Sequence, residues 1–366
     1  KADVEMRVMA AAGAETSTMH FGEPSTDPEI RALAEKLKMI SLSFSSHGHI
    51  YDTAFGNATM AKAWNPDDPV ATGQALIEVL RKKESLPSAV CRPEYISFFP
   101  EPGLGPITYA NLPEYYGQPP YELSASEQAR YQTFLTKFLI GARAVRQTWP
   151  EIKILLPYGD PLFSVPFLRN SPEARELIDG VGLDMPNFER MPESQLHQVV
   201  LHRLWQCQQE FLKAGKPHPR FVVVEGPCVS ASDASLTPQE QGDYLTRIML
   251  HYLAYGVHEI ESLVSPFDCS SYWGEQHYGY GLMRRVPNLS PKPAFTSYAT
   301  LTRHLNRCVY EATLETGSRT VFGLRFKHFA SDKRVHAWWT VRGTRQVTLT
   351  VPATVKRLEW YDQMDN

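Results

Sequence analysis

Short runs of apolar residues alternate with longer amphipathic stretches over most of the chain, up to about residue 307. Because polar residues are scarce within the short runs, these runs predict strands buried on both faces, as in a parallel sheet. The longer stretches repeat their apolar residues at helical spacing and predict helices between the strands. The expected strands cover residues 14–21, 39–44, 94–100, 152–157, 180–183, 220–224 and 259–264.

Helix start signals support the same alternation. Asp27 and Pro28 open one predicted helix as N-cap and first-turn proline, and Thr237-Pro238-Gln239-Glu240 is a capping box that opens another. The other expected helices cover residues 4–12, 69–83, 126–149 and 193–214. Alternating strands and helices predict an α/β fold, and the strand count favours a (β/α)8 TIM barrel that lacks its first strand. A shorter, open α/β fold is the alternative.

After residue 308 the pattern changes to period two, with alternating segments at 321–326, 335–341 and 347–351. Such segments, separated by turn residues, predict a small antiparallel β-sandwich packed against the barrel. Strict alternation also places Trp338 on the opposite face from Trp339. The apolar alternates expected to form the core of the sandwich are Val321, Leu324, Phe326, Val335, Ala337 and Trp339.

Two domains are therefore expected, a barrel over residues 1–307 and a β-sandwich over residues 308–366 that adds no catalytic residue. The chain begins in what resembles the end of a helix and stops in what resembles the middle of a sheet. We expect the barrel to be incomplete at its N-terminal end, the sandwich to be incomplete at its C-terminal end, and the sequence to be a fragment of a longer polypeptide.

The composition is ordinary for a globular protein and excludes little. Hydrophobic residues make up 43% of the chain and charged residues 21%, while the net charge of -3 gives no attraction to nucleic acid or anionic membranes. No apolar run is long enough to span a bilayer. The five cysteines show no C-x-x-C spacing, and no H-E-x-x-H motif occurs, so neither a metal nor a cofactor is expected. The oligomeric state is not indicated.

Two glutamates end apolar runs and are the main candidates for chemistry. Glu101 follows the run 95–100, and Glu225 follows the run 220–224. An unpaired carboxylate inside a buried strand is very costly, but at the carboxyl end of the strand it can open into a site. Two carboxylates that face one cavity are the machinery of glycosidic bond cleavage. The alternative is that both glutamates cap loops or pair with arginines.

Around these glutamates the sequence resembles clan A of the glycoside hydrolases. Phe99-Pro100-Glu101-Pro102 matches the Asn-Glu-Pro motif that ends the fourth barrel strand of the clan, except that Pro100 replaces Asn. Val223-Val224-Glu225-Gly226 matches the end of the seventh strand. The order of the segments 238–245, 255–257, 280–282 and 291–295 also fits the clan.

This resemblance implies a retaining glycoside hydrolase that acts on a polysaccharide or oligosaccharide through a glycosyl-enzyme intermediate. Glu225 would be the nucleophile and Glu101 the acid/base. The clan's Asn usually binds the 2-hydroxyl of the sugar, a contact that supplies several kcal/mol in the transition state. Since proline cannot make this contact, another residue must bind the hydroxyl, or the substrate is unusual there, or the activity is weak or lost.

Six further side chains are candidates for substrate binding because they follow predicted strands. They are His47, His49, Tyr109, Tyr158, Asp184 and Trp273. An aromatic face suits the apolar face of a sugar, and clan members often place an aromatic platform where Trp273 lies. The alternatives are that the histidines are solvated and that Trp273 packs against the rim of the barrel.

A rival interpretation is a non-catalytic carbohydrate-binding or structural protein that retains the barrel, and Pro100 is its best support. An enzyme acting on polysaccharides would work in an extracellular or periplasmic location, because such substrates are too large to enter cells. The partner expected for the enzyme is a carbohydrate substrate.

Overall fold

A computed structural model gives the fold of the chain over a set of separate segments. The described residues are 2–14, 28–37, 65–84, 95–97, 124–156, 161–184, 191–195, 201–225, 236–257, 259–260, 267–268, 279, 281–284 and 289–366. The predicted strand at 39–44 lies outside these residues, as does nearly all of the one at 14–21.

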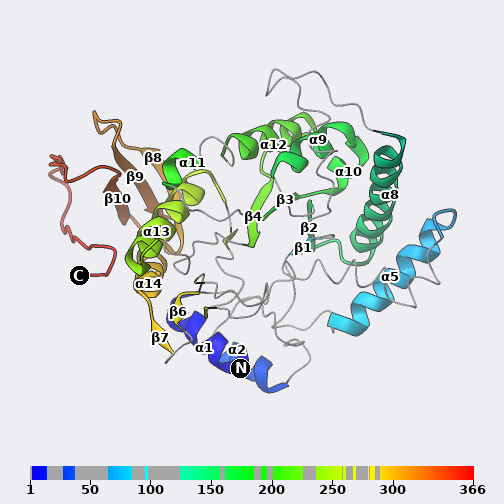
Figure 1. Cartoon of the computed structure of the whole chain (residues 1–366), viewed down its shortest axis with the longest axis horizontal. Coiled ribbons are helices and arrows are strands. Elements are labelled where there is room, and N and C mark those ends of the chain that lie inside the picture. The colour runs from blue at the N-terminus through cyan, green and yellow to red at the C-terminus, as the bar shows by residue number, and fades with distance from the viewer. Residues whose placement is uncertain are drawn as a thin grey trace.

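A five-stranded sheet forms the centre of the fold (Figure 1). Its strands are β1 (Tyr95–Ser97), β2 (Lys153–Leu156), β3 (Gly180–Asp184), β4 (Arg220–Glu225) and β5 (Glu259–Ile260). They lie side by side in chain order, and every neighbouring pair is parallel. Each strand coincides with a range predicted from the apolar runs, and β3 and β4 extend one residue beyond it. Only part of the predicted range is described for β1, β2 and β5. Parallel neighbours in chain order require a crossover after each strand, which is the alternation of an α/β fold.

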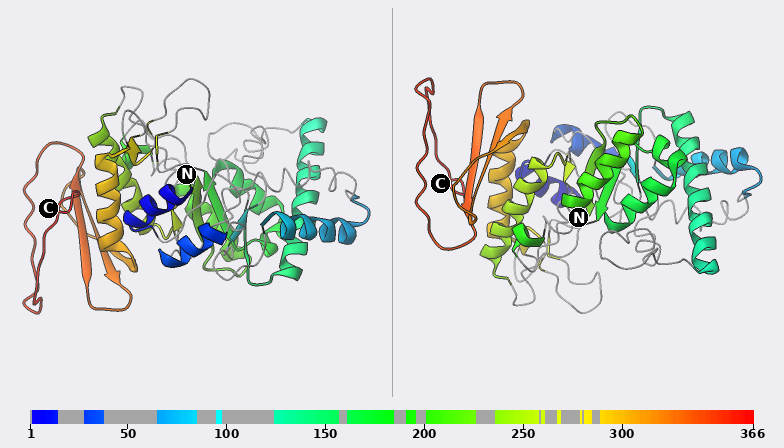
Figure 2. Two further views of the ribbon diagram at one scale, coloured as in Figure 1. Left: turned by 90° about the horizontal axis from the view of Figure 1, so that it is seen from below. Right: turned by 90° about the horizontal axis from the view of Figure 1, so that it is seen from above.

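Helices connect and cover these strands (Figures 1 and 2). They are α1 (Ala2–Ala11), α2 (Pro28–Lys36), α5 (Pro69–Glu84), α8 (Ala125–Thr148), α9 (Pro161–Asn170), α10 (Pro172–Leu177), α11 (Pro192–Gln195), α12 (His202–Lys213), α13 (Pro238–Ala254) and α14 (Pro293–Leu305). The predictions for α1, α2, α5, α8 and α13 are confirmed. The single helix predicted over 193–214 corresponds to α11 and α12, and residues 196–200 lie outside the described residues. The sequence analysis did not predict α9, α10 or α14. α9 carries Pro166, and an interior proline removes a helical hydrogen bond.

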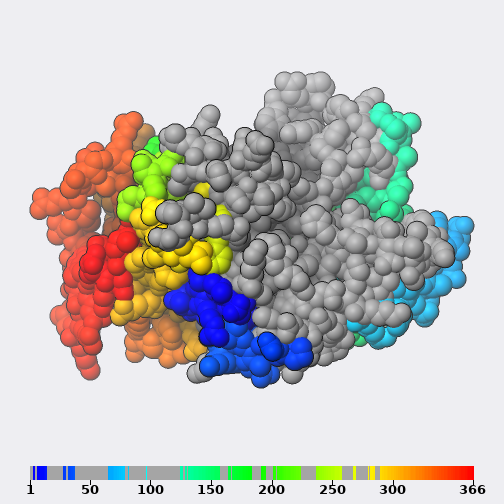
Figure 3. Space-filling model, turned by 60° about the horizontal axis from the view of Figure 1, so that its bottom comes forward, coloured from blue at the N-terminus to red at the C-terminus, as the bar shows by residue number. Residues whose placement is uncertain are grey.

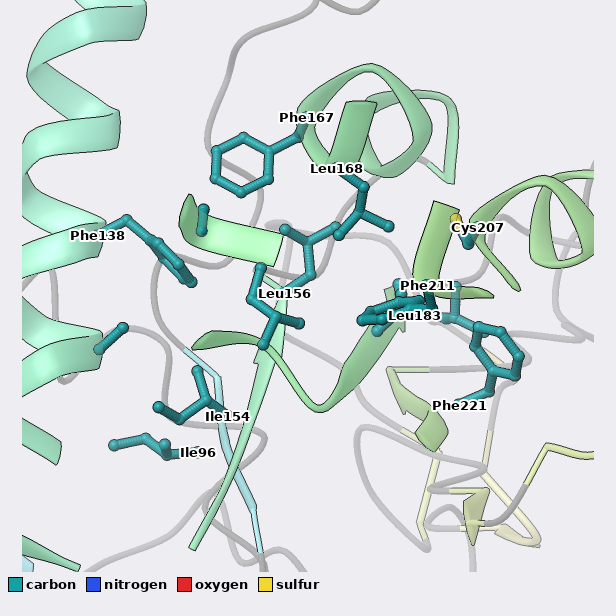
Figure 4. Close-up of a cluster of buried hydrophobic side chains, with 14 of the residues drawn as sticks. Ile96, Phe138, Ile154, Leu156, Phe167, Leu168, Leu183, Cys207, Phe211 and Phe221 are labelled. Carbon is teal, nitrogen blue, oxygen red and sulfur yellow. The ribbon is translucent and has the colours of Figure 1, made fainter. Parts of the chain in front are cut away.

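The main core lies between the sheet and the helices that follow its strands. Figure 4 shows Phe138 of α8 and Phe167 of α9 close to Ile154 and Leu156 of β2. The two phenylalanine rings meet edge to face, with centroids 5.6 Å apart. All four side chains are buried. The apolar run of β2 therefore supplies one layer of this core and the buried faces of α8 and α9 supply the other, as buried parallel strands require.

The first described helix packs against the last helix of the alternating region, α14. The Thr302 hydroxyl of α14 donates a hydrogen bond of 2.7 Å to the Ala12 carbonyl. Gly13 has a φ of 81°, and a Cβ placed there would lie 2.4 Å from Thr302 Oγ1. The views agree that α1 (blue) lies beside α14 (gold) (Figures 2 and 3). Helices from opposite ends of the alternating region are thus neighbours in space.

A three-stranded antiparallel sheet follows the alternating region. It consists of β8 (Cys308–Thr313), β9 (Val321–His328) and β10 (Arg334–Thr340), with β9 in the middle. Leu324 and Phe326 of this sheet form a buried cluster with Leu250 of α13 and Leu305 of α14. Val335, Ala337 and Trp339 pack against the same cluster. The predicted packing of these five alternates against the helices is confirmed.

Val321 is the exception among the predicted core residues of this sheet. It is buried but does not belong to that cluster, because the two-residue period of β9 places Phe322 on the face of Leu324 and Phe326. The Phe322 ring stacks on the half-buried Trp339, with centroids 5.3 Å apart. Trp338 is opposite Gly323 in the register and covers it, so the prediction that the two tryptophans face opposite sides is confirmed.

The prediction of a strand at 347–351 is wrong. Residues 344–351 adopt no regular secondary structure, and Val347 and Val351 are 40% and 43% exposed. Alternation alone does not make a strand, since a strand also needs a hydrogen-bonded neighbour. In the described residues beyond 308, therefore, only one sheet is formed.

A short antiparallel pair, β6 (Met283–Arg284) and β7 (Ser290–Pro291), lies before α14.

Candidate active site

The carboxyl ends of β3 and β4 bring two acidic residues next to each other. Asp184 ends β3 and Glu225 ends β4, and these two residues are partners in the register of the parallel pair. The register shifts between Leu183 and Asp184, so the ladder becomes irregular where the acidic residues begin. Val222 and Val223 just before them are fully buried. The buried strands β3 and β4 therefore end in acidic residues at the carboxyl edge of the sheet. Parallel α/β folds place their functional sites at this edge.

The strand before the other predicted catalytic residue ends at the same edge. β1 ends at Ser97 and runs parallel to β2, as do β3 and β4, so the chain leaves β1 toward the edge that carries Glu225. Glu101 itself lies outside the described residues. So do His47, His49, Tyr109, Tyr158 and Trp273. The roles assigned to all eight site residues therefore stay predictions.

A polar network that the sequence analysis missed joins the start of α13, the start of α14 and the segment between β5 and α14. The Lys292 ammonium donates to Asp268 Oδ1 at 2.6 Å and to the Gly279 carbonyl at 2.8 Å. The Gln241 amide donates to the same Gly279 carbonyl at 2.8 Å and to the Gly281 carbonyl at 3.4 Å. Asp268 also accepts a hydrogen bond of 3.0 Å from the Gly281 amide. In the sequence, the only signal for Gln241 and Lys292 is that they lie in the segments 238–245 and 291–295, whose order fits the clan.

The Lys292 side chain is 2% exposed, whereas that of Asp268 is 26% exposed. Burial lowers the pKa of Lys292, and the hydrogen bond and charge of Asp268 counteract part of that effect. A buried ammonium is tolerated only with a close counter-charge and acceptors. Asp268 and the Gly279 carbonyl supply these and offset the desolvation cost of the buried ammonium.

A second buried ionic cluster connects the C-terminal sheet to the segment that follows β3. Glu193 of α11 accepts hydrogen bonds from the Arg247 guanidinium of α13, one of them at 2.7 Å, and from the Trp339 indole of β10 at 2.8 Å. Burial alone would raise the pKa of Glu193, but the hydrogen bonds and charge of Arg247 outweigh it, so the pKa is lowered. The cluster fixes the sheet against the α/β region.

Within the described ranges, no group of three or more His, Cys, Asp or Glu side chains is arranged to hold a metal ion. None of the helices in the described part of the chain is long and apolar enough to cross a membrane.

The chain resembles known proteins in its three-dimensional structure, whereas comparisons of its sequence find no match. No family model and no curated protein sequence matches the chain. The fold is similar to a family 39 glycoside hydrolase from the gut symbiont Bacteroides cellulosilyticus, with a TM-score of 0.61, 15% identity, and coverage of 96% of this chain and 71% of that one. It is also similar to a glucosidase from Croceicoccus marinus, with a TM-score of 0.50, 10% identity, and coverage of 88% and 70%.

The resemblance to clan A glycoside hydrolases that the motifs indicated is thus confirmed for the fold. At these identities the likeness concerns the fold and does not transfer an activity.

Proposed function

We propose that this chain is a retaining glycoside hydrolase built on a (β/α)8 barrel, with Glu225 as nucleophile and Glu101 as acid/base. The observation that carries the proposal is the position of Glu225 at the carboxyl end of β4, in register with Asp184 at the end of β3. A fold similar to a glycoside hydrolase over 96% of the chain supports it.

The closed barrel is part of the same proposal. The five parallel strands β1 to β5 would be consecutive strands of its wall. The contact between Ala12 at the end of α1 and Thr302 of α14 supports closure, because the first and last helices of a barrel are neighbours in the outer ring. Residues 1–307 would form this barrel, and residues 308–366 would form an accessory β-domain.

The retaining mechanism would require the carboxyl groups of Glu101 and Glu225 to lie ~5–5.5 Å apart. The Glu225 carboxylate would attack the anomeric carbon while the Glu101 carboxylic acid protonates the leaving glycosidic oxygen, which yields a covalent glycosyl-enzyme. Glu101, now ionised, would take a proton from water, and that water would release the sugar from Glu225 with its original anomeric configuration.

The remaining predicted site residues would bind the sugar. Asp184 would accept hydrogen bonds from sugar hydroxyls, because its position beside Glu225 is close to the reacting ring. Trp273 would support the apolar face of a sugar ring, and Tyr109 and Tyr158 would extend this surface. His47 and His49 would bind further hydroxyls. The substrate would be a polysaccharide or oligosaccharide, which implies an extracellular or periplasmic enzyme.

The test is turnover by matched variants on a panel of polysaccharides and aryl glycosides. Glu225→Gln should lower kcat by about 10⁴-fold or more, as expected when a covalent nucleophile is removed, and its thermal unfolding should resemble that of the wild type. Glu101→Ala should recover activity on aryl glycosides with good leaving groups, since these need no protonation. Glu173→Gln, an exposed glutamate on α10, is the control and should leave turnover unchanged.

Two results would contradict the proposal. Undiminished turnover by Glu225→Gln would remove the nucleophile assignment, and NMR detection of an inverted product anomer would remove the retaining mechanism. The second candidate function is a carbohydrate-binding protein without catalysis, which the sequence favours through Pro100 in place of the clan's Asn. Binding of an oligosaccharide by the wild type with no hydrolysis of any panel member would establish it.

A further inference from the structure

Residues 347–351 have the pattern of a strand but no strand beside them. They read Val-Thr-Leu-Thr-Val, which alternates apolar residues with threonine and contains no charge, glycine or proline. In the part of the chain that the structure describes, no backbone–backbone hydrogen bond involves residues 346–351. Val347 and Val351 are exposed. Unpaired backbone groups together with exposed apolar side chains are the features with which a further strand can pair.

This segment lies on the outside of the molecule. In both views of Figure 2 the three-stranded sheet lies between α14 (gold) and the chain beyond β10 (red), at the end of the molecule opposite α5. Three more apolar side chains in this part of the chain are exposed, Val355 by 44%, Leu358 by 54% and Trp360 by 65%. Exposed apolar side chains that gather on one segment are typical of a surface that contacts another protein molecule.

The order of the residues indicates that the partner is a second copy of this chain. The stretch 347–351 reads the same in both directions from Leu349. When two copies pair antiparallel about Leu349, Val347 of one copy lies opposite Val351 of the other. Threonine then lies opposite threonine on the other face, and both kinds of cross-strand pair are favourable. A two-fold interface has this property, because residue i contacts residue j while j contacts i.

Pro352 determines which backbone groups can form the ladder. In an antiparallel pair, opposite residues alternate between hydrogen-bonded and non-hydrogen-bonded positions. If Leu349 exchanges hydrogen bonds with its own counterpart, Pro352 lies opposite Gln346 in a non-hydrogen-bonded position, where its missing N–H has no cost. On the outer edge of the same ribbon Pro352 would have to donate a hydrogen bond. Addition of a third copy is therefore disfavoured, and the pairing closes at two.

The charges near the segment are compatible with this pairing. Residues 346–352 carry no charge, and the flanking Arg345 would lie opposite Ala353. Like charges directly opposite each other would destabilise the pair, and none occurs in the paired stretch. The extended stretch ends at a turn, in which the Val355 amide donates to the Pro352 carbonyl at 2.9 Å. The residues available for pairing are thus the uncharged ones.

We propose that this chain forms a two-fold dimer in which residues 346–352 of two copies pair as an antiparallel β-ribbon about Leu349. The ribbon gathers the apolar side chains of residues 347, 349 and 351 from both copies on one face. A two-stranded ribbon is a small interface, so we expect a Kd on the order of 10 µM. The proposal is independent of the proposed function, because none of these residues belongs to the candidate active site.

The experiment uses the position on the two-fold axis, with sedimentation velocity of the full chain over about 1–100 µM. The wild type should show a monomer–dimer equilibrium. Leu349→Arg places two like charges opposite each other and removes an apolar pair, so it should weaken dimerisation by about tenfold or more. Leu349→Glu should do the same. An equimolar mixture of the two variants should regain the dimer, because arginine then lies opposite glutamate.

The matched control is Val355→Arg, which adds the same charge to an exposed apolar position outside the paired stretch and should leave dimerisation unchanged. Circular dichroism of each variant should match that of the wild type. The mixture also tests the folding of both variants, since misfolded chains would not recover the dimer together.

Three results would overturn the proposal. The first is a wild type that stays monomeric at 100 µM, as expected if residues 344–351 pair instead with the outer edge of β10 in the same chain. The second is a dimer that Leu349→Arg leaves intact or that the mixture does not restore. The third is growth beyond two copies, which would exclude two-fold closure. None of these results bears on turnover, so the two proposals fail separately.

Discussion

The contact between Arg247 and Glu193 should contribute more to stability than any exposed ion pair of the chain. The side chains of Arg247 and Glu193 are 14% and 8% exposed, and the guanidinium bonds both carboxylate oxygens. Removing one partner of a buried pair costs about 3–5 kcal/mol, because the other charge stays buried. We expect Arg247→Met to lower the free energy of unfolding by ~3 kcal/mol, the lower end, since Trp339 still donates to Glu193.

The size of this loss should depend on pH with a defined sign. In the wild type the pKa of Glu193 is lowered below its unfolded value, so the pair stabilises the fold above about pH 4.5 and loses this contribution as the pH falls through the folded pKa. In Arg247→Met, burial of Glu193 is no longer countered by a cation, and its pKa should lie above the unfolded value. The difference between variant and wild type should therefore shrink as the pH is lowered from 7 toward 4.

Urea unfolding followed by circular dichroism at several pH values measures this difference. The matched control is Arg143→Met, which breaks the ion pair of Arg143 with Glu173, because these side chains are 44% and 56% exposed. Exposed pairs contribute ~0–1 kcal/mol, so the control should change stability little. Equal losses for Arg247→Met and Arg143→Met, or a loss for Arg247→Met that does not vary with pH, would refute the reasoning.

Two further changes test separate parts of the fold. Thr237→Ala should lower the free energy of unfolding in urea by ~1 kcal/mol, because Thr237 Oγ1 accepts a hydrogen bond from the Glu240 amide in the capping box of α13. Thr237→Ser keeps the hydroxyl and should be as stable as the wild type, so an equal loss in Thr237→Ser would contradict this origin. Trp339→Phe should lower the free energy of unfolding by about 1.5–3 kcal/mol, because it keeps an aromatic ring beside Phe322 but removes the hydrogen-bond donor to Glu193. Equal stability of variant and wild type would show that this hydrogen bond contributes nothing to stability.

Much of the α/β region could be predicted from local sequence signals. The capping box at Thr237 starts α13 at the expected residue, and the apolar run before Glu225 forms β4. Such signals work because helix starts and buried strands depend on neighbouring residues, through backbone hydrogen bonds and side-chain period. The motifs around Glu101 and Glu225, together with the order of the motifs downstream, also indicated a fold similar to glycoside hydrolases, as the structural comparison bears out.

Features that depend on distant partners could not be predicted in the same way. The period of residues 347–351 is that of a strand, yet the segment forms none, because period alone supplies no neighbouring strand. Val321 was predicted in the same core as Leu324 and Phe326, but the two-residue period of the strand places Phe322 on their face instead.

The candidate site shows the same division. Sequence placed acidic residues at the ends of two buried strands, but only the register of β3 and β4 made Asp184 and Glu225 neighbours. Lys292 and Asp268 are separated by 24 residues, and nothing local in the sequence links them. Their contact exists because α14 starts beside the segment that follows β5 and buries the ammonium there. The sequence around each strand thus determines which polar residues lie at the edge of the sheet. Packing between distant segments determines which of these residues are in contact.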